Sequence, residues 1–194
     1  MLTLDALHAA VGGRIIQKGP EEFSGVSIDS RTIKDGELFI ALQGERHDGH
    51  AFLNAALQKA HGAIVCRDFD CSRINHAHQH RTIIAVENTL DALQAAASYR
   101  RNMFSGHVIG VVGSNGKTTT KELIASVLST RFIVHKTTGN LNNHIGLPLT
   151  LIRAPQHAEI FVVEMGTNQP GDIKSLCEIA RPTIGVITNI GMEH

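Results

Sequence analysis

The chain of 194 residues contains no tryptophan, one tyrosine and only three cysteines. Three cysteines without a framework spacing exclude a disulfide-stapled secreted domain and favour a reducing compartment. An excess of charge of one sign is lacking too, because eighteen basic side chains balance eighteen acidic ones. This balance argues against the basic surface that binds nucleic acid or an anionic membrane. We therefore expect a cytoplasmic protein with no nucleic-acid partner.

Long hydrophobic runs are missing as well. The N-terminal stretch MLTLDALHAAVGG is too short and too interrupted to span a membrane, and it lacks the basic start of a secretory signal. The chain still has 42% hydrophobic residues, which is enough for one large or two small cores. These features predict a soluble protein with no membrane span.

One local cluster combines the side-chain types that bind zinc: Cys66, Cys71, His76, His78 and His80. Their spacing lacks the long insert that lets two pairs of ligands converge on one ion. Cys66 also ends an apolar run typical of a strand, where a buried thiol is ordinary. We interpret the cluster as a polar loop between two strands rather than as a metal site.

Hydrophobic patterning and turn residues divide the chain into three blocks. In the first block, Thr3 is expected to cap a short helix that ends at Gly12 and Gly13. The elements expected in the first two blocks are strands near 26–29, 38–42, 63–66 and 82–86, and helices near 50–60 and 89–103. We place a domain boundary within 102–106, which gives an N-terminal domain of residues 1–104 and a second domain of residues 105–194.

The third block alternates strands with helices. Strands are expected near 108–112, 132–135, 160–164 and 184–187, and helices near 118–128, after Pro148 and near 173–180. Such alternation implies right-handed crossovers and a parallel sheet that is covered on both faces. The predicted fold class is therefore α/β, with a mixed N-terminal domain followed by a parallel-sheet domain. Ligands of such sheets gather at the carboxyl ends of the strands.

The most informative stretch is HVIGVVGSNGKTTTKE, residues 107–122. Its apolar start predicts a buried strand, which breaks into the glycine-rich turn 113–116 and leads directly into a helix. In such a turn the backbone N–H groups point inward, the helix N-terminus adds partial positive charge, and Lys117 adds a full one. The Thr118 hydroxyl would coordinate Mg²⁺ on the phosphates. This order predicts a P-loop for ATP, although Val111 stands where the common pattern has a glycine.

Further polar groups follow other strands of the expected sheet. Glu164 ends the apolar run 160–163, and a carboxylate beside a P-loop suits a magnesium ligand, with a solvated strand-end charge as the alternative. The segment 137–146 carries three asparagines, which suit phosphate or carboxylate contacts or form an ordinary turn. Thr188 and Asn189 follow the last strand, whereas His194, taken alone, is more often exposed than functional.

Four separated motifs, GSNGKTTTKE, TTGNLNNHIGLPLTL, VVEMGTNQPGDI and ITNIGMEH, together resemble the middle domain of the Mur ligase family. In the first block, SIDSRTIKDGELFIALQGERHDGHAF resembles a UDP-binding module of the same family. Within it, the sequence is similar to the branch that adds D-alanyl-D-alanine to UDP-N-acetylmuramoyl-tripeptide, because Met165-Gly166-Thr167-Asn168 follows Glu164. In the branch that adds the third amino acid, serines usually follow this glutamate.

The resemblance implies a role for each matching residue. Lys117 is implied as the catalytic lysine on the transferring γ-phosphate, and Asn140 and Asn143 are implied near that phosphate and the substrate. The implied ligands of Mg²⁺ are Thr118, Glu164 and His194. The residues implied to wrap the ATP phosphates are Gly113, Ser114, Asn115, Gly116, Lys117, Thr118 and Thr119. The residues implied to bind the UDP end of the substrate are Ile28, Ser30, Arg31, Arg46, His47, Asp48 and His50. For this last set, a polar loop that leaves the contacts to backbone groups is the alternative.

The resemblance implies an ATP-dependent amide ligase of peptidoglycan precursor synthesis. It would act as a monomer, on UDP-N-acetylmuramoyl-tripeptide and D-alanyl-D-alanine. Family members are longer, with a C-terminal domain and a modified lysine that this sequence does not contain, so we expect the 194 residues alone to be an inactive part of the ligase. The alternatives are a ligase that adds the third amino acid and a non-catalytic nucleotide-binding paralogue.

Overall fold

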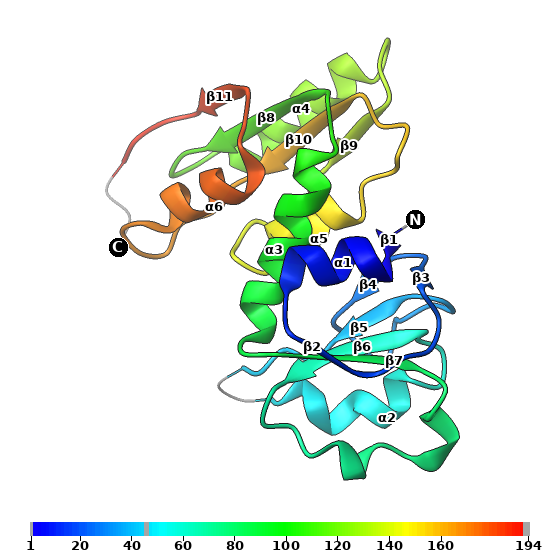
Figure 1. Ribbon diagram of the computed structural model, residues 1–194. Coiled ribbons are helices and arrows are strands. Elements are labelled where there is room, and N and C mark those ends of the chain that lie inside the picture. The colour runs from blue at the N-terminus through cyan, green and yellow to red at the C-terminus, as the bar shows by residue number, and fades with distance from the viewer. Residues whose placement is uncertain (1, 45–46, 192–194) are drawn as a thin grey trace. The chain divides into compact units, whose positions relative to one another are not determined.

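The computed structural model describes residues 2–44 and 47–191, so Arg46 and His194 lie outside the described residues. The chain folds into two compact units, residues 1–96 and 97–194 (Figure 1). Helix α3 (Thr89–Asn102) crosses this division. The boundary at 104/105 stays a prediction about where the two domains can be separated.

The first unit is built on a five-stranded mixed sheet of order β2-β7-β6-β5-β4. Strands β4 to β7 are parallel, whereas the edge strand β2 runs antiparallel to β7. Its strands are β2 (Arg14–Gln17), β4 (Val26–Ser27), β5 (Leu38–Ile40), β6 (Gly62–Cys66) and β7 (Thr82–Val86). A short antiparallel pair, β1 (Leu2–Thr3) with β3 (Glu22–Phe23), lies outside this sheet.

Local signals explain the first helix of this unit. In α1 (Leu4–Val11), the Thr3 hydroxyl accepts a hydrogen bond from the Ala6 N–H at 3.3 Å, and Gly12 ends the helix with a positive φ of 67°. The helix predicted over 50–60 is wrong in its extent. A 3₁₀ helix (Gly49–Phe52) precedes the short α2 (Leu53–Ala56), and the Asp48 carboxylate caps the 3₁₀ turn through the His50 N–H.

The cysteine- and histidine-rich segment connects β6 to β7, as predicted. It forms two 3₁₀ turns, Cys71–Arg73 and His76–His78, whose first N–H groups are capped by the side chains of Asp70 and Asn75. Across residues 2–44 and 47–191, no three histidine, cysteine or acidic side chains lie close enough to hold a metal ion.

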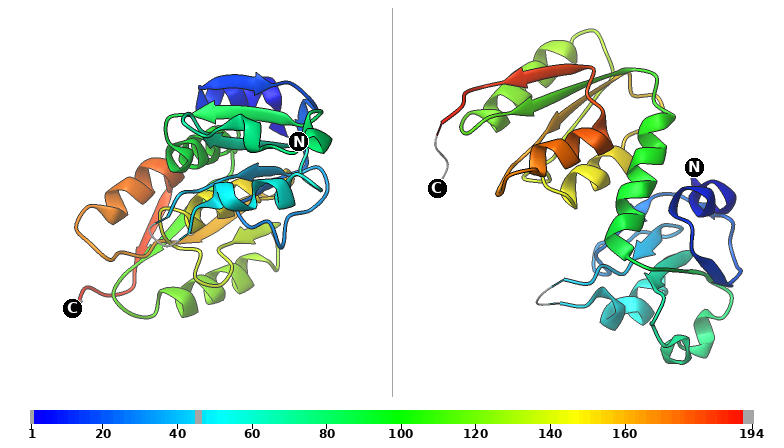
Figure 2. Two further views of the ribbon diagram at one scale, coloured as in Figure 1. Left: turned by 90° about the horizontal axis from the view of Figure 1, so that it is seen from below. Right: turned by 60° about the vertical axis from the view of Figure 1, so that its left-hand side comes forward.

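The second unit contains a four-stranded, fully parallel sheet of order β11-β8-β10-β9. Its elements are β8 (His107–Val112), α4 (Lys117–Leu128), β9 (Val134–Lys136), α5 (Gly146–Ile152), β10 (Ile160–Glu164), α6 (Asp172–Ala180) and β11 (Ile184–Ile187). Helix α4 packs on one face, where Ala125 meets Val111 and Val162. Helices α5 and α6 cover the other face, where Leu147 and Leu176 join the cluster around Phe161 (Figure 2, right). The predicted α/β class, with a parallel sheet covered on both faces, is confirmed.

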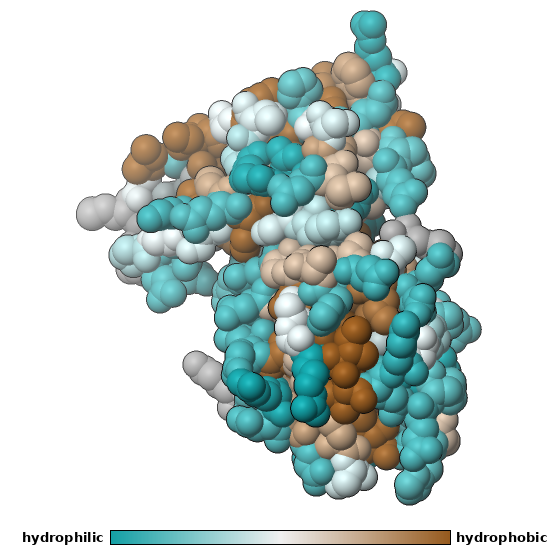
Figure 3. All heavy atoms as spheres, in the orientation of Figure 1, coloured by the Kyte–Doolittle hydropathy of each residue, from teal (hydrophilic) through white to brown (hydrophobic). Residues whose placement is uncertain are grey.

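Strand β11 forms one edge of this sheet. Ile184 and Ile187 on it are 47% and 63% exposed, and Ile190 beyond it is 88% exposed. Figure 3 shows hydrophobic residues at this end of the second unit. Within the described ranges, no helix is long and apolar enough to cross a membrane.

Candidate nucleotide- and metal-binding site

The loop between β8 and α4 has the backbone of a phosphate-binding turn. Gly113 has φ +137° and Gly116 has φ +81°, conformations that L side chains rarely adopt. A Cβ atom on Gly113 would also lie 2.1 Å from the Thr188 hydroxyl oxygen, so only glycine fits there. Helix α4 begins at Lys117, directly after Gly116. The first N–H groups of a helix have no acceptor within it, so those of α4 are the natural donors to a phosphate.

The segment after β11 braces this loop. The Thr188 hydroxyl donates to the Asn115 carbonyl at 2.6 Å, and the Asn115 N–H donates to the Asn189 side-chain oxygen at 2.8 Å. The Ser114 N–H donates to the Asn189 carbonyl at 3.2 Å. Thr188 and Asn189 therefore meet the P-loop at the carboxyl end of the sheet, as their position after the last strand predicts. The Ser114 and Asn115 N–H groups already have acceptors in the protein.

The Lys117 ammonium lies over the loop itself. Its Nζ donates to the Gly113 carbonyl at 2.5 Å and to the Ser114 carbonyl at 3.2 Å. These carbonyls hold the lysine at the mouth of the turn, where phosphate charge would concentrate. Thr119, one residue after Thr118, lines a pocket of about 490 Å³ beside α4 together with Glu122 and Lys136.

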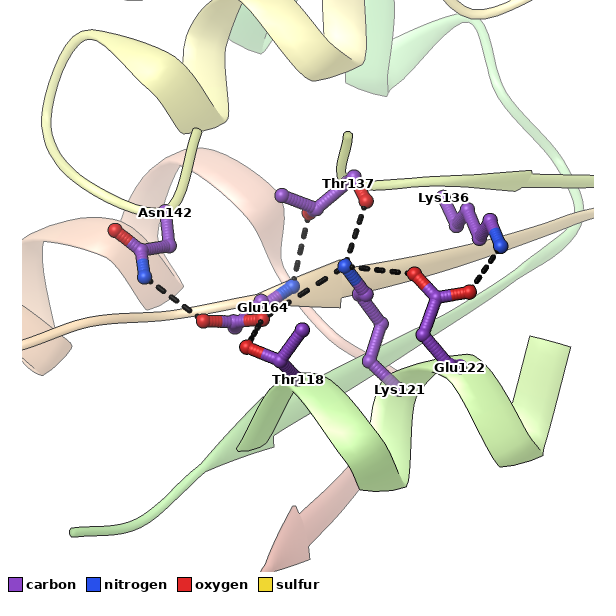
Figure 4. A network of polar contacts seen from close by, with 7 residues as sticks. All are labelled: Thr118, Lys121, Glu122, Lys136, Thr137, Asn142 and Glu164. Carbon is purple, nitrogen blue, oxygen red and sulfur yellow. Dashed lines mark hydrogen bonds and ion pairs between the residues drawn. The ribbon is translucent and has the colours of Figure 1, made fainter. Parts of the chain in front are cut away.

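Glu164, at the end of β10, is only 3% exposed. Its Oε2 accepts from the Thr118 hydroxyl at 2.9 Å, and its Oε1 accepts from the Asn142 side-chain amide at 2.8 Å (Figure 4). Its backbone N–H donates to the Thr137 hydroxyl at 3.0 Å. A buried carboxylate is costly unless such donors surround it.

The oxygens of Thr118 and Glu164 suit magnesium. Mg²⁺ prefers hard oxygen ligands and is bound through one or two carboxylates together with substrate phosphates. The two oxygens lie 2.9 Å apart beside the P-loop, so they fit one ion that also contacts a phosphate. The structure thus brings together two of the three predicted metal ligands, and the third, His194, is outside the described residues.

The asparagine-rich loop reaches Glu164 through a residue that was not among those predicted, while the predicted roles of Asn140 and Asn143 toward ATP stay predictions. The Asn143 side-chain oxygen accepts from the N–H groups of Ile145 and Gly146, at 3.1 and 2.8 Å, and so caps α5. This cap explains why α5 begins two residues before Pro148 rather than after it. Asn140 is exposed, and Asn142 contacts Glu164 instead. Sequence reasoning missed Asn142, because three asparagines within four residues carry no signal of which one points inward.

The described residues among those predicted to bind UDP lie at one edge of the first unit's sheet, whereas Arg46 is outside the described residues. Residues 28–31 follow β4, residues 43–44 and 47–50 follow β5, and these strands are parallel neighbours. Arg31 forms a two-point ion pair with Asp29, with Nε–Oδ1 and Nη2–Oδ2 distances of 2.9 and 2.7 Å. The hydrogen bond from Arg31 lowers the pKa of Asp29 to about 2. The side chain of Arg31 is 86% exposed, so its guanidinium stays accessible.

His50 has a supporting position at this edge. Its ring is buried, Nδ1 lies 2.5 Å from Asp48 Oδ1, and Nε2 accepts from the Cys66 N–H at 2.9 Å. Both ring nitrogens are therefore used within the protein, and the ring stacks on Phe69. The predicted partners around it are more open, since Ile28 and Ser30 are half-buried and His47 and Asp48 are exposed.

Two family models match the chain along most of its length. The one described as "Mur ligase family, catalytic domain" matches residues 22–101, and the one described as "Mur ligase middle domain" matches residues 111–194.

Named relatives agree with these models. The UDP-N-acetylmuramoyl-tripeptide--D-alanyl-D-alanine ligase of Bacillus subtilis (strain 168) is 47% identical over 170 residues, which cover 88% of this chain and 36% of that protein. The crystal structure of MurF from Acinetobacter baumannii matches with a TM-score of 0.87 at 34% identity, over 97% of this chain and 41% of that one. The structure of MurF from Thermotoga maritima, solved in complex with ADP, matches with a TM-score of 0.74 at 39% identity, over 86% and 38% of the two chains.

The chain therefore spans 36–41% of the length of these relatives. The same family is indicated by the two matched regions, by the glycine loop and by the buried glutamate at the end of a strand. The chain belongs to the Mur ligase family, and its residues cover the N-terminal domain and part of the middle domain of a MurF-like protein.

Proposed function

We propose that this chain is the nucleotide-binding part of an ATP-dependent ligase that joins D-alanyl-D-alanine to UDP-N-acetylmuramoyl-tripeptide. The observation that carries the proposal is the buried Glu164 carboxylate, held between Thr118 and Asn142 beside a P-loop. The choice of substrates is supported by the 47% identity to the Bacillus subtilis ligase of that name. The reaction itself is proposed for the whole protein, with residues 1–194 as its binding part.

In the proposed reaction, the terminal carboxylate of the tripeptide attacks the γ-phosphorus of ATP, and ADP leaves. The amine of D-alanyl-D-alanine then attacks the carbonyl carbon of the acyl phosphate. The amine loses a proton as the amide forms, and phosphate departs. Such chemistry needs mainly positioning and stabilisation of charge on the phosphoryl oxygens.

The residues of this chain would divide that work. The first N–H groups of α4 would hold phosphate oxygens, and Lys117 would exchange the Gly113 and Ser114 carbonyls for the γ-phosphate. Thr118 and Glu164 would hold Mg²⁺, which neutralises phosphoryl charge when bound. The edge formed by residues 28–31, 43–44 and 47–50 would hold the UDP end and keep the distant carboxylate in line.

The first test is nucleotide binding by this chain, measured by calorimetry with Mg²⁺ and ATP. Lys117→Ala should weaken binding by about tenfold to a hundredfold, because a charge-assisted hydrogen bond to phosphate is lost. Lys174→Ala, which removes an exposed lysine from α6, is the matched control and should bind like the unaltered chain. Equal affinity of the Lys117→Ala variant and the control would contradict the P-loop assignment.

The second test concerns the substrates, and it uses the whole protein. Phosphate release should require both UDP-N-acetylmuramoyl-tripeptide and D-alanyl-D-alanine. Release with a UDP-linked dipeptide and a single amino acid would instead identify the branch that adds the third residue.

A further inference from the structure

A second lysine of α4, Lys121, is buried beside the metal-binding carboxylate. Its side chain is 1% exposed, although most lysines of folded proteins reach solvent. It lies three residues after Thr118, a spacing that places both side chains on one face of the helix. Figure 4 shows that face turned toward Glu164.

The Lys121 ammonium touches two other elements of the unit. Its Nζ donates to the Thr137 carbonyl at 2.9 Å, where β9 passes into the asparagine-rich loop. It also lies 3.8 Å from Glu164 Oε2, the oxygen that accepts from the Thr118 hydroxyl. One side chain thus joins α4, the start of the loop and the end of β10.

Thr137 completes this connection from the other side. It is fully buried, its N–H donates to the Val162 carbonyl at 3.0 Å, and its hydroxyl accepts from the Glu164 N–H. Asn142, five residues further along the same loop, donates to the other Glu164 oxygen. The loop is therefore attached to Glu164 at two points, to its backbone N–H through Thr137 and to its carboxylate through Asn142, and Lys121 holds the Thr137 carbonyl.

A second carboxylate, Glu122, lies 3.1 Å from Lys121 Nζ. Glu122 also pairs with Lys136, which is 43% exposed. The charge of Glu122 is therefore balanced from the solvent side without Lys121. Glu164 is buried, in contrast, and both partners of its ion pair with Lys121 are shielded from solvent. The two lysines of this network, one buried and one exposed, provide a matched pair for experiment.

We propose that Lys121 is a positioning residue for metal-dependent nucleotide binding. By holding the Thr137 carbonyl and the Glu164 carboxylate together, it keeps Glu164 Oε2 against Thr118, so that two oxygen ligands are in place before Mg²⁺ arrives. Residues that orient a metal ligand through hydrogen bonds commonly contribute tenfold or more to the affinity for the ion. The proposal rests on the proposed function, because it assumes that the P-loop takes ATP with Mg²⁺.

The test compares ATP binding by this chain in Mg²⁺ and in EDTA, and the ratio of the two affinities measures the contribution of the metal. Lys121→Met, which keeps the length of the side chain but removes the charge and the donors, should lower this ratio by about tenfold. The affinity for ATP in EDTA should stay nearly unchanged, because Lys117 and the helix N-terminus remain. Lys136→Met, the control, should leave the ratio unaltered.

If Lys121 had a purely structural role, Lys121→Met would lower the thermal midpoint and both ATP affinities together, without a change in the ratio of the affinities. A further variant tests the path through Glu164. In a Glu164→Gln background, where the ligand itself is already altered, Lys121→Met should cause no additional loss of the ratio.

Lys121→Gln, which keeps an amide donor in the buried site, serves as the second variant if Lys121→Met does not fold. An unaltered ratio in whichever variant folds, or failure of both to fold, would overturn the proposal and leave Lys121 a folding residue. Absence of ATP binding by the unaltered chain would instead contradict the proposed function on which the inference rests.

Discussion

At the scale of single residues, two buried side chains lie at the sheet edges that we propose as ligand sites, and they differ in how their polar atoms are used. Glu164 accepts hydrogen bonds from the Thr118 hydroxyl and the Asn142 amide, both of which are side chains at the carboxyl end of the sheet. His50 has both ring nitrogens bonded within the protein, to Asp48 and to the Cys66 backbone. Glu164 therefore suits the metal-ligand role that we propose for it, whereas His50 supports the turn at Asp48.

The ion pair of Asp29 and Arg31 gives a prediction about pH. The pKa of Asp29 is about 2 in the folded protein, below its usual 3.8, because Arg31 donates hydrogen bonds to the carboxylate. A carboxyl group whose folded pKa is depressed stabilises the protein above its unfolded pKa. This contribution is therefore present above about pH 4 and is lost as the pH falls toward 2.

Arg31→Met should raise the pKa of Asp29 toward 3.8, as measured by NMR titration of the carboxyl carbon. Because Arg31 is 86% exposed, solvent and salt screen the pair, and the stability should change little at neutral pH. Lys34→Met is the matched control. It removes a positive charge three residues further along the chain and keeps the backbone N–H that bonds Glu37. A pKa of Asp29 that remains near 2 in Arg31→Met would contradict the assigned cause.

At the scale of elements, helix ends decide where two segments of the second unit pack. Arg101, near the end of α3, donates to the carbonyls of Ala180 and Arg181 at the end of α6, at 2.7 and 2.8 Å. These carbonyls receive no hydrogen bond from an N–H group of their own helix, and a cation is favoured at that end of the helix dipole. The last turns of α3 consequently belong with the second unit rather than the first.

The side chain of Asn143, which caps the start of α5, gives a prediction about stability. Asn143→Ala should lower the free energy of unfolding of the second unit by about 1 kcal/mol, because two N–H groups lose their acceptor. Denaturant unfolding measures the change. Asn140→Ala removes an exposed asparagine from the same loop and should leave the stability nearly unaltered. Equal losses in the two variants would show that the cap is not the cause.

At the scale of the whole molecule, each unit has a hydrophobic core of its own and an edge that we propose as a ligand site. The core of the first unit gathers around Phe39, Ala63 and Leu57, and that of the second around Phe161 and Val163. The edge with residues 28–31, 43–44 and 47–50 follows strands of the first unit. The proposed UDP site and the proposed ATP site are thus formed by separate sheets.

This division predicts that the first unit binds the UDP end of the substrate without ATP. A protein of residues 1–105 should release heat with UDP-N-acetylmuramoyl-tripeptide in calorimetry. Free D-alanyl-D-alanine, which has no uridine, should give none. Absence of heat with the UDP-linked peptide at millimolar concentration would show that the site needs the second unit.

Much of the fold followed from the sequence because its signals are local. The strands expected at 82–86, 160–164 and 184–187 have those bounds in the structure, and α1 lies between Thr3 and Gly12 as expected. The edge strand β2 was not expected, because four residues between a helix and a turn become a strand only through pairing with β7, some seventy residues away.

The P-loop and the strand-end glutamate could be predicted from the sequence, since glycine spacing, a lysine at a helix start and an apolar run are properties of short segments. Only the tertiary structure decided that Asn142 rather than Asn140 or Asn143 reaches Glu164, and that Lys121 lies buried beside it. The physical reason is that the direction of a loop side chain depends on the backbone around it. That backbone is held by contacts such as those of Thr137 with Val162 and Glu164, which join residues distant in sequence.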